Sequence, residues 1–231
     1  MSAVLINTLT VLAGSFIGIF LKKGIPEKYT GATMTAIGLF SMVIGFQGAF
    51  ESRNLLVLLI STILGVLTGT LLDIDGALNR LGKKVEDRFS KNGDGLVAKG
   101  FVTATLLFCV GSMTIVGSLQ AGTTGDTTML ITKSMMDLFS SMMLAVTVGI
   151  GVLLASGSVL VIEGALVLLA SVLSPLLSDT MIAEMTAAGS LMIIGIGLNL
   201  AGITKLKVAD YLPAILYAPF VSLLFHALGI G

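Results

Sequence analysis

Apolar residues occupy the chain in long stretches that recur from its first residues almost to its last. Read with a window of about 19 residues, each stretch is long enough to cross a bilayer as a helix, which needs about 20 residues. None shows the alternating sidedness of a barrel strand. The pattern predicts an all-α, polytopic transmembrane helical bundle of about eight spans, near residues 3–21, 33–50, 54–72, 100–119, 136–156, 158–177, 185–203 and 208–229.

Composition supports the bilayer as the solvent of this chain. Of its 231 residues 55% are hydrophobic and 11% are charged, whereas soluble proteins carry roughly 25% charged residues. No basic residue precedes the first apolar stretch, so we expect it to be a permanent span and not a cleaved signal. Residues 1–231 are therefore expected to form a single integral membrane domain whose main partner is the lipid bilayer.

The distribution of lysine and arginine predicts an orientation. Short loops that carry basic residues stay in the cytoplasm, and with eight crossings eleven of the thirteen basic residues fall on one side. This predicts a multi-pass protein with both termini outside the cytoplasm.

The most polar stretch of the chain, residues 73–99, lies on the predicted cytoplasmic side. Apolar residues recur there at helical spacing, which favours a short amphipathic helix along the membrane face, and the alternative is an ordinary surface connector. The residues with this spacing are Ile74, Leu78, Leu81, Val85 and Phe89.

A short string occurs twice. The sequence MTAIG at 34–38 returns as MTAAG at 185–189, and GFQ at 45–47 parallels GLN at 197–199. The two copies open the second and the seventh span, which would cross the membrane in opposite directions. This indicates an inverted repeat of spans 1–3 and 6–8, and the interface of such repeats is where transporters bind their substrates. The alternative is chance similarity in a sequence rich in alanine, glycine and methionine.

The fourth span contains glycine–serine pairs that favour a break in the helix. A broken helix exposes backbone amides and carbonyls, and each half-helix end carries a partial charge that can hold an ion or an anionic group. The candidate substrate-binding residues of this span are Gly111, Ser112, Gly117, Ser118 and Gln120. Asp126, in the glycine-containing stretch that follows, is a candidate ion-binding residue.

Lys133, Asp137 and Glu163 are ionisable residues at or within apolar spans, where a charge costs about 2.5–3.5 kcal/mol on insertion scales. Lys133 and Asp137 are four residues apart and can pair on one helix face. They either form an interfacial pair with the lysine snorkelling outwards or line a polar vestibule beside the fourth span. Glu163 lies deeper in its span and is either a neutral carboxyl bonded to hydroxyl groups or a proton or cation site.

Gln47 and Asn199 occupy corresponding places in the repeated strings, and their amides serve either to bond helices together or to line a cavity. No motif of a hydrolase, metalloprotease or nucleotide-binding loop is present, and one histidine and one cysteine cannot form the usual metal clusters. We therefore expect no enzyme activity, no cofactor and no metal. The balance of thirteen basic and thirteen acidic residues gives no reason to expect a nucleic-acid partner.

Three stretches of the chain stand out: Cys109–Asp137, VGIGV at 148–152 and Ile196–Ala214. Through them the chain resembles, over essentially its whole length, the YqgA-like bacterial inner-membrane family (domain of unknown function 554). Glu163 and Asp210 depart from the glutamine and asparagine that are usual in the family. The resemblance implies a polytopic, multi-pass protein of the bacterial plasma (inner) membrane, with a transport-related role and an unsettled substrate.

These observations predict a small secondary transporter or permease for an unknown small solute or ion, with a midplane site at the broken fourth helix. The alternatives are a channel and a non-transporting membrane scaffold or assembly factor. The sequence leaves a homo-oligomer open. Gly111, Ser112, Gly117, Ser118, Gln120, Lys133, Asp137, Gln47 and Asn199 are the candidate substrate-binding residues, and Glu163 and Asp126 are the candidate ion-binding residues.

Overall fold

The computed structural model describes residues 1–22, 27–89 and 95–229. Over these residues helices are the only regular secondary structure. In chain order they are α1 (Ser2–Lys22), α2 (Glu27–Ala49), α3 (Leu55–Leu71), α4 (Ile74–Phe89), α5 (Leu96–Cys109), α6 (Ser112–Thr123), α7 (Thr128–Val148), α8 (Ile150–Leu173), α9 (Asp179–Leu200), the 3₁₀-helix η1 (Val208–Tyr211) and α10 (Pro213–Ala227). The all-helical architecture predicted from the apolar stretches is confirmed.

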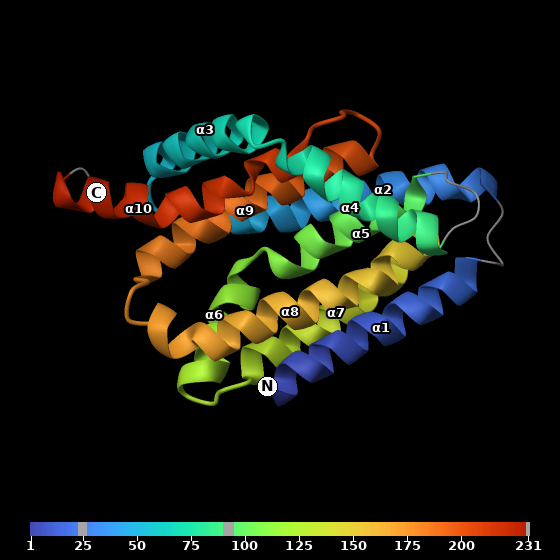
Figure 1. Cartoon of the computed structure of the whole chain (residues 1–231), viewed down its shortest axis with the longest axis horizontal. Helices are drawn as coiled ribbons and strands as arrows, with labels where there is room; N and C mark the ends of the chain where they lie inside the picture. The colour runs from blue at the N-terminus through green and yellow to red at the C-terminus, as the bar shows by residue number, and fades with distance from the viewer. Residues whose placement is uncertain (23–26, 90–94, 230–231) are drawn as a thin grey trace.

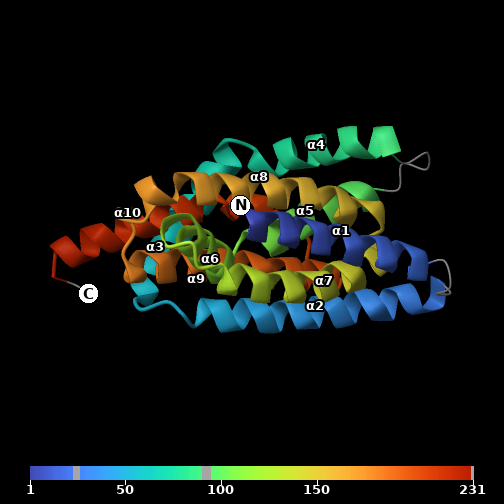
Figure 2. The same cartoon turned by 90° about the horizontal axis from the view of Figure 1, so that it is seen from below.

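Most helices lie along the long axis of the molecule, in a bundle with α2 on one face and α4 on the opposite face (Figures 1 and 2). The core that joins them is made largely by α5, α7, α8 and α9. Many leucine and phenylalanine side chains remain exposed on the outer faces, among them Phe16, Phe20 and Leu71. Exposed apolar side chains on the outside of an apolar bundle are what lipid solvates, so the surface fits a membrane protein.

Five helical segments are long and apolar enough to cross a membrane as they stand: Ser2–Leu21, Thr128–Val148, Ile150–Leu173, Asp179–Leu200 and Val208–Ala227. Two bent helix pairs raise this number to seven if each pair is one span: α3 with α4, bent by 55°, and α5 with α6, bent by 57°. The apolar part of α2, Met34–Ala49, is shorter than the others. The structure thus supports five to seven spans, and eight crossings stay a prediction.

Glycine residues bring helix pairs into backbone contact. Gly14 and Gly18 of α1 lie directly against the backbone of α7, where a Cβ atom would collide with main-chain oxygens. Close approach of this kind replaces the hydrophobic drive that is missing between helices in lipid. These glycines therefore fix α1 on α7, and α1 carries a polar side chain into the site described below.

The helices that carry the repeated string, α2 and α9, pack against each other in opposite directions. Gly38 meets Gly197 and Ala201 at one end of the contact, and Gly48 meets Ser190 at the other. An antiparallel pair is what an inverted repeat requires of these two helices. The repeat itself stays a prediction.

The boundary between the fifth and sixth predicted spans is wrong. We expected it near residue 157, but α7 ends at Val148 and α8 starts at Ile150. Gly149 makes the turn with φ 76° and ψ −141°, a conformation that glycine adopts without steric cost. As a result α7 begins eight residues earlier than expected, so the pair Lys133 and Asp137 lies within a helix and not at its entrance.

The predicted amphipathic helix appears as α4, which covers most of the polar stretch 73–99. Asp73, at the bend between α3 and α4, has φ 51° and accepts a hydrogen bond from Arg80 at 2.7 Å. That exposed contact lowers the pKa of Asp73. The part of the predicted connector at residues 90–94 lies outside the described residues, and α5 already begins at Leu96.

Candidate functional site

The predicted break in the fourth span is present between α5 and α6. Val110 is extended and Gly111 has φ 156° and ψ 158°, a region that is essentially reserved for glycine. Across the break the hydroxyl of Thr114 donates a hydrogen bond to the carbonyl of Phe108 at 3.1 Å. This bond satisfies one of the carbonyls that the end of α5 leaves without an intrahelical donor.

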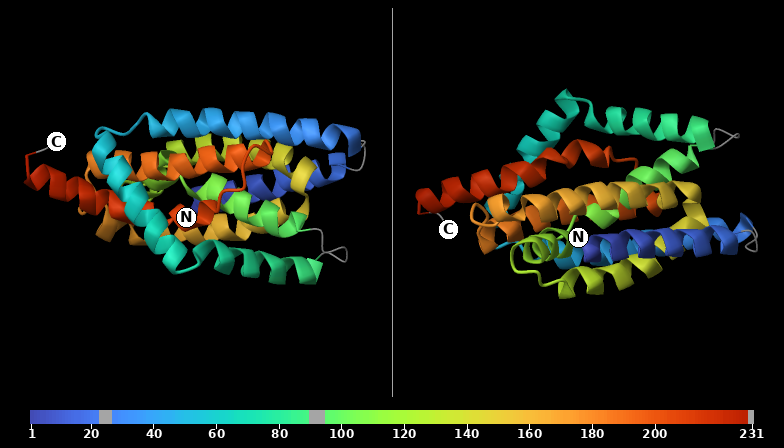
Figure 3. Two further views of the ribbon diagram at one scale, coloured as in Figure 1. Left: turned by 90° about the horizontal axis from the view of Figure 1, so that it is seen from above. Right: turned by 60° about the horizontal axis from the view of Figure 1, so that its bottom comes forward.

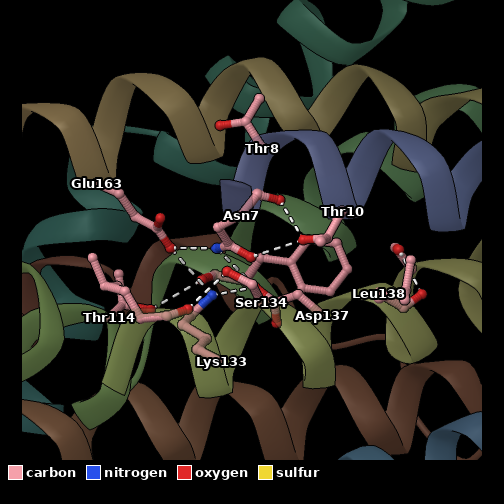
Figure 4. A network of polar contacts seen from close by, with 12 residues as sticks. Asn7, Thr8, Thr10, Thr114, Lys133, Ser134, Asp137, Leu138 and Glu163 are labelled. Atoms are coloured by element: carbon pink, nitrogen blue, oxygen red, sulfur yellow. Dashed lines mark hydrogen bonds and ion pairs between the residues drawn. The ribbon is translucent and has the colours of Figure 1, made fainter. Parts of the chain in front are cut away.

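Four polar side chains from three helices meet inside the bundle next to this break (Figure 4). Lys133 forms an ion pair with Asp137 one turn further along α7, and its ammonium lies 3.2 Å from Oε1 of Glu163 on α8. The side-chain amide of Asn7 on α1 donates to Glu163 Oε1 at 2.7 Å and to Asp137 Oδ2 at 3.1 Å. We call Asn7, Lys133, Asp137 and Glu163 the polar cluster.

The polar cluster is almost fully removed from the surface of the bundle. Asn7 and Glu163 have no exposed area, and the side chains of Lys133 and Asp137 are 8% and 10% exposed. The ammonium of Lys133 turns inwards to two carboxyls, so the snorkelling alternative does not describe it. Glu163 Oε2 has no hydrogen-bond partner among the described residues. Burial without pairing is expensive for a charged group, so this oxygen needs an explanation.

A cavity of about 240 Å³ connects the helix break to two members of the polar cluster. It runs from the end of α2 to the break, between α5, α6, α7 and α9, and we call it the break cavity. Besides apolar residues its walls include Gln47, Glu51, Gly111, Thr114, Lys133, Asp137, Thr186 and Ser190. The structure therefore brings four of the predicted site residues to one cavity: Gln47, Gly111, Lys133 and Asp137.

Three other candidates of the fourth span, Gly117, Ser118 and Gln120, lie away from the break cavity. Gly117 packs against Leu130, and Ser118 is buried with a hydroxyl that has no partner within the described chain. Ser112 is the first residue of α6, but its side chain is not among those described. The backbone carbonyl of Gln120 accepts hydrogen bonds from the amide and the hydroxyl of Thr124. Gly117, Ser118 and Gln120 are not part of the break-cavity wall given above.

The two remaining candidates have local structural partners. The amide of Asn199 bonds Thr204 and both backbone groups of Leu206, so it fixes the turn after α9 and does not face the break cavity. Asp126 is exposed and accepts a hydrogen bond from the backbone N–H of Thr128 at 2.9 Å, at the start of α7. This bond lowers the pKa of Asp126.

A second cavity, of about 500 Å³, lies nearer the start of α5. It is bounded by α4, by α5 as far as Leu106, by the end of α9 and by η1, and we call it the α4 cavity. Its walls include Asp75, Lys83, Glu86, Lys99, Thr103, Leu106, Ile196 and Asn199. Along α5 it ends at Leu106, and the break cavity begins at Leu107. The two cavities therefore approach each other from opposite ends of the bundle.

Sequence reasoning missed two polar residues that the structure makes important. Asn7 was read as part of an apolar span, although an amide within such a span is itself a signal of an interior partner. Glu184 on α9 is fully buried and accepts hydrogen bonds from Ser52, Arg53 and Asn54. In the part of the chain that the structure describes, no three His, Cys, Asp or Glu side chains are grouped as a metal site would need.

Comparison with known proteins identifies relatives along the whole chain. The profile of the family described as "Protein of unknown function (DUF554)" matches residues 2–223. The "Uncharacterized membrane protein YdfK" of Bacillus subtilis (strain 168) is 34% identical over 234 residues, covering 100% of this chain and 99% of the relative. The "Uncharacterized protein YqgA" of Escherichia coli (strain K12) is 31% identical over 217 residues, which is 92% of each chain. No solved structure matches. The chain belongs to the DUF554 family.

Proposed function

We propose that this member of the DUF554 family is a small secondary transporter whose substrate site is the break cavity. The observation that carries the proposal is the placement of two cavities end to end on either side of one segment of α5 and α9 (Figure 3 shows both helices within the bundle). A carrier needs a central site that is reached from one side of the membrane at a time. Two cavities that approach each other without merging match this requirement.

The partition between the cavities is made of buried apolar side chains. Leu106 and Phe108 of α5 are 3% and 1% exposed, and Ile193 and Ile196 of α9 are similarly buried. Leu106 and Ile196 line the α4 cavity, whereas Phe108 and Ile193 line the break cavity. A polar solute cannot cross such a layer without losing its hydration. Passage therefore requires α5 and α9 to move relative to each other.

The break cavity offers polar groups that suit a small charged or polar solute. The first amides of α6 have no intrahelical acceptor, and the start of a helix carries partial positive charge. Lys133 and Asp137 add one charge of each sign at the cavity wall. A volume of about 240 Å³ is below the roughly 300–1,000 Å³ of pockets for drug-sized ligands. We therefore expect a solute of few heavy atoms, driven by an ion gradient or by its own gradient.

Cysteine accessibility tests this proposal. In a Cys109→Ala background, single cysteines at Gln47 and Thr114 would report on the break cavity, and one at Thr103 would report on the α4 cavity. A membrane-impermeant thiol reagent is expected to reach the first two from one face of the membrane and the third from the opposite face. Val159→Cys, at a position with no exposed area, is the matched unreactive control.

Two outcomes would contradict the carrier. If Thr114→Cys and Thr103→Cys are as unreactive as Val159→Cys, the bundle is dry and the scaffold alternative gains support. If one face reaches both positions without a change of conformation, the protein is a channel. For activity, cells carrying Asp137→Asn are expected to show the same change in metabolite profile as cells that lack the protein, whereas the exposed variant Lys205→Ala should behave as wild type.

A further inference from the structure

The polar cluster contains more acidic than basic groups. Lys133 supplies one positive charge, and Asp137 and Glu163 would supply two negative charges if both were ionised. Among the described residues, Lys133 is the cation that contacts Glu163. α1 brings the neutral Asn7, α6 has no titratable side chain, α7 has only Lys133 and Asp137, and α5 brings the thiol of Cys109. Lys99 of α5 is exposed beside the α4 cavity, and Met1, whose side chain lies near Gly164, is exposed at the surface. An ordinary thiol is neutral at pH 7, so the fully ionised cluster would bury one uncompensated negative charge.

The hydrogen bonds show which of the two carboxyls has fewer donors to stabilise a negative charge. Asp137 Oδ2 receives both the ammonium of Lys133 and the amide of Asn7. Glu163 Oε1 receives the same two donors, but Glu163 Oε2 has no partner within the described residues. An anionic oxygen without a donor in a dry site costs more than a neutral carboxyl oxygen in the same place.

We propose that Glu163 is a proton-binding site, that it holds a proton in the conformation described here, and that transport is coupled to the release of this proton. The proposal rests on the transporter function above for the coupling, but not for the proton. With Glu163 neutral, Lys133 and Asp137 remain as a balanced ion pair. The chemistry is a simple dissociation in which the Glu163 O–H bond breaks, the electron pair stays on the carboxylate and the proton passes to water.

The geometry connects this proton to the solute. Glu163 does not line the break cavity, but Lys133 and Asp137 do, and they lie between the cavity and Glu163. A solute or water that draws Lys133 towards the cavity weakens its contact with Glu163, whereas a newly formed Glu163 carboxylate attracts it. The position of Lys133 and the protonation of Glu163 therefore depend on each other. Because such coupling is reciprocal, solute binding changes the proton affinity of Glu163 by the same factor by which protonation changes the affinity for the solute.

Infrared spectroscopy of the protein in lipid nanodiscs tests the proton directly, without any solute. At pH 7 wild type should show the carbonyl-stretch band of a buried protonated carboxyl, shifted by exchange into D₂O. Glu163→Gln is expected to remove the band, whereas Glu184→Gln, which changes the other glutamate with no exposed area among the described residues, should leave it. Absence of the band from wild type, or its survival in Glu163→Gln, would overturn the proposal. Should Glu163→Gln fail to fold, Glu163→Asp must move the band instead.

A second experiment tests the coupling. The rate at which an impermeant thiol reagent labels Thr114→Cys is expected to change with pH, by at most about tenfold per pH unit for a single proton. Glu163→Gln should abolish the pH dependence beyond that of the reagent, which is measured on free cysteine, and Glu184→Gln should retain it. A band without pH-dependent labelling would reject coupling and leave the proton site. Unreactive cavity cysteines with the band intact would instead reject the transporter.

Discussion

Glu163 and Glu184 are both fully buried, and both lie within apolar helices of the bundle. Their surroundings differ in the donors that they meet. Glu184 Oε1 accepts from the backbone N–H groups of Arg53 and Asn54 at 2.8 and 2.9 Å, and Oε2 accepts from the hydroxyl of Ser52 at 2.8 Å. Glu163 shares its two donors with Asp137 and keeps one oxygen without a partner.

This comparison separates two uses of a buried carboxyl. Glu184 holds the connection between α2 and α3 by accepting hydrogen bonds from donors that water would otherwise satisfy, which is a structural task. Glu163 lies beside Lys133 and Asp137, which line a cavity. Two carboxyls therefore share one cation there, so one of the two carboxyls can hold a proton. Burial alone therefore does not identify a functional carboxyl. The pattern of donors around it does.

The largest effect is expected from Glu184→Ala. The change removes the acceptor of three hydrogen bonds at the start of α3, each worth about 0.5–1.5 kcal/mol, and leaves a cavity in place of a fully buried side chain. We expect a loss of about 3–5 kcal/mol, measured as unfolding free energy in detergent or nanodiscs. Glu184→Gln is the matched control, because its Oε1 can still accept both backbone N–H groups while its amide bonds Ser52. Equal losses in the two variants would show that the hydrogen bonds are not what Glu184 provides.

Lys133→Ala should have the next largest effect. Removing one partner of a buried ion pair costs about 3–5 kcal/mol because it strands the opposite charge, and protonation of Asp137 should hold the loss near about 3 kcal/mol. A double-mutant cycle identifies the stranded charge. If Glu163 is neutral, Lys133→Ala couples strongly with Asp137→Asn and by less than about 1 kcal/mol with Glu163→Gln. Strong coupling to Glu163→Gln would mean that Glu163 is ionised in the folded protein.

Glu163→Gln by itself is expected to change stability by less than about 1 kcal/mol, because glutamine has the shape of a neutral glutamic acid. The same substitution should remove the pH dependence of labelling described above. For Glu184 we expect the reverse: Glu184→Ala lowers stability, and Glu184→Gln leaves the pH dependence of labelling unchanged. The melting temperatures of wild type, Glu163→Gln and Glu184→Gln, measured across pH 5–8, compare the two carboxyls directly.

The sequence was sufficient for contacts that are local and insufficient for those that join distant helices. Gly111 and the i,i+4 spacing of Lys133 and Asp137 predicted the break and the ion pair, because both depend on neighbouring residues. Asn7 and Glu163 lie 156 positions apart, and nothing in their local sequence states that they meet.

The same reason explains two differences between expectation and structure. The repeated string pairs Asn199 with Gln47, but the amide of Asn199 bonds the turn that follows its own helix. Asn199 lines the α4 cavity, whereas Gln47 lines the break cavity. The end of α7 was placed too late because hydropathy continues unchanged through Gly149. A turn between two apolar helices is decided by backbone conformation, which hydropathy does not record.

Asp126 extends the comparison to a carboxyl that has a backbone donor but no burial, and it should show the smallest effect. Its bond from the N–H of Thr128 lowers the pKa of Asp126 relative to the unfolded chain. A lowered pKa adds stability above the unfolded value, about 4 for aspartate, and this stability is lost as pH falls through the folded value. Asp126→Asn keeps the acceptor oxygen and removes the charge. Its melting temperature should therefore lie slightly below that of wild type at pH 7, and the two should converge as the pH falls below 4. A difference as large as that of Glu184→Ala would mean that a backbone donor, and not burial, decides how much a carboxyl stabilises this fold.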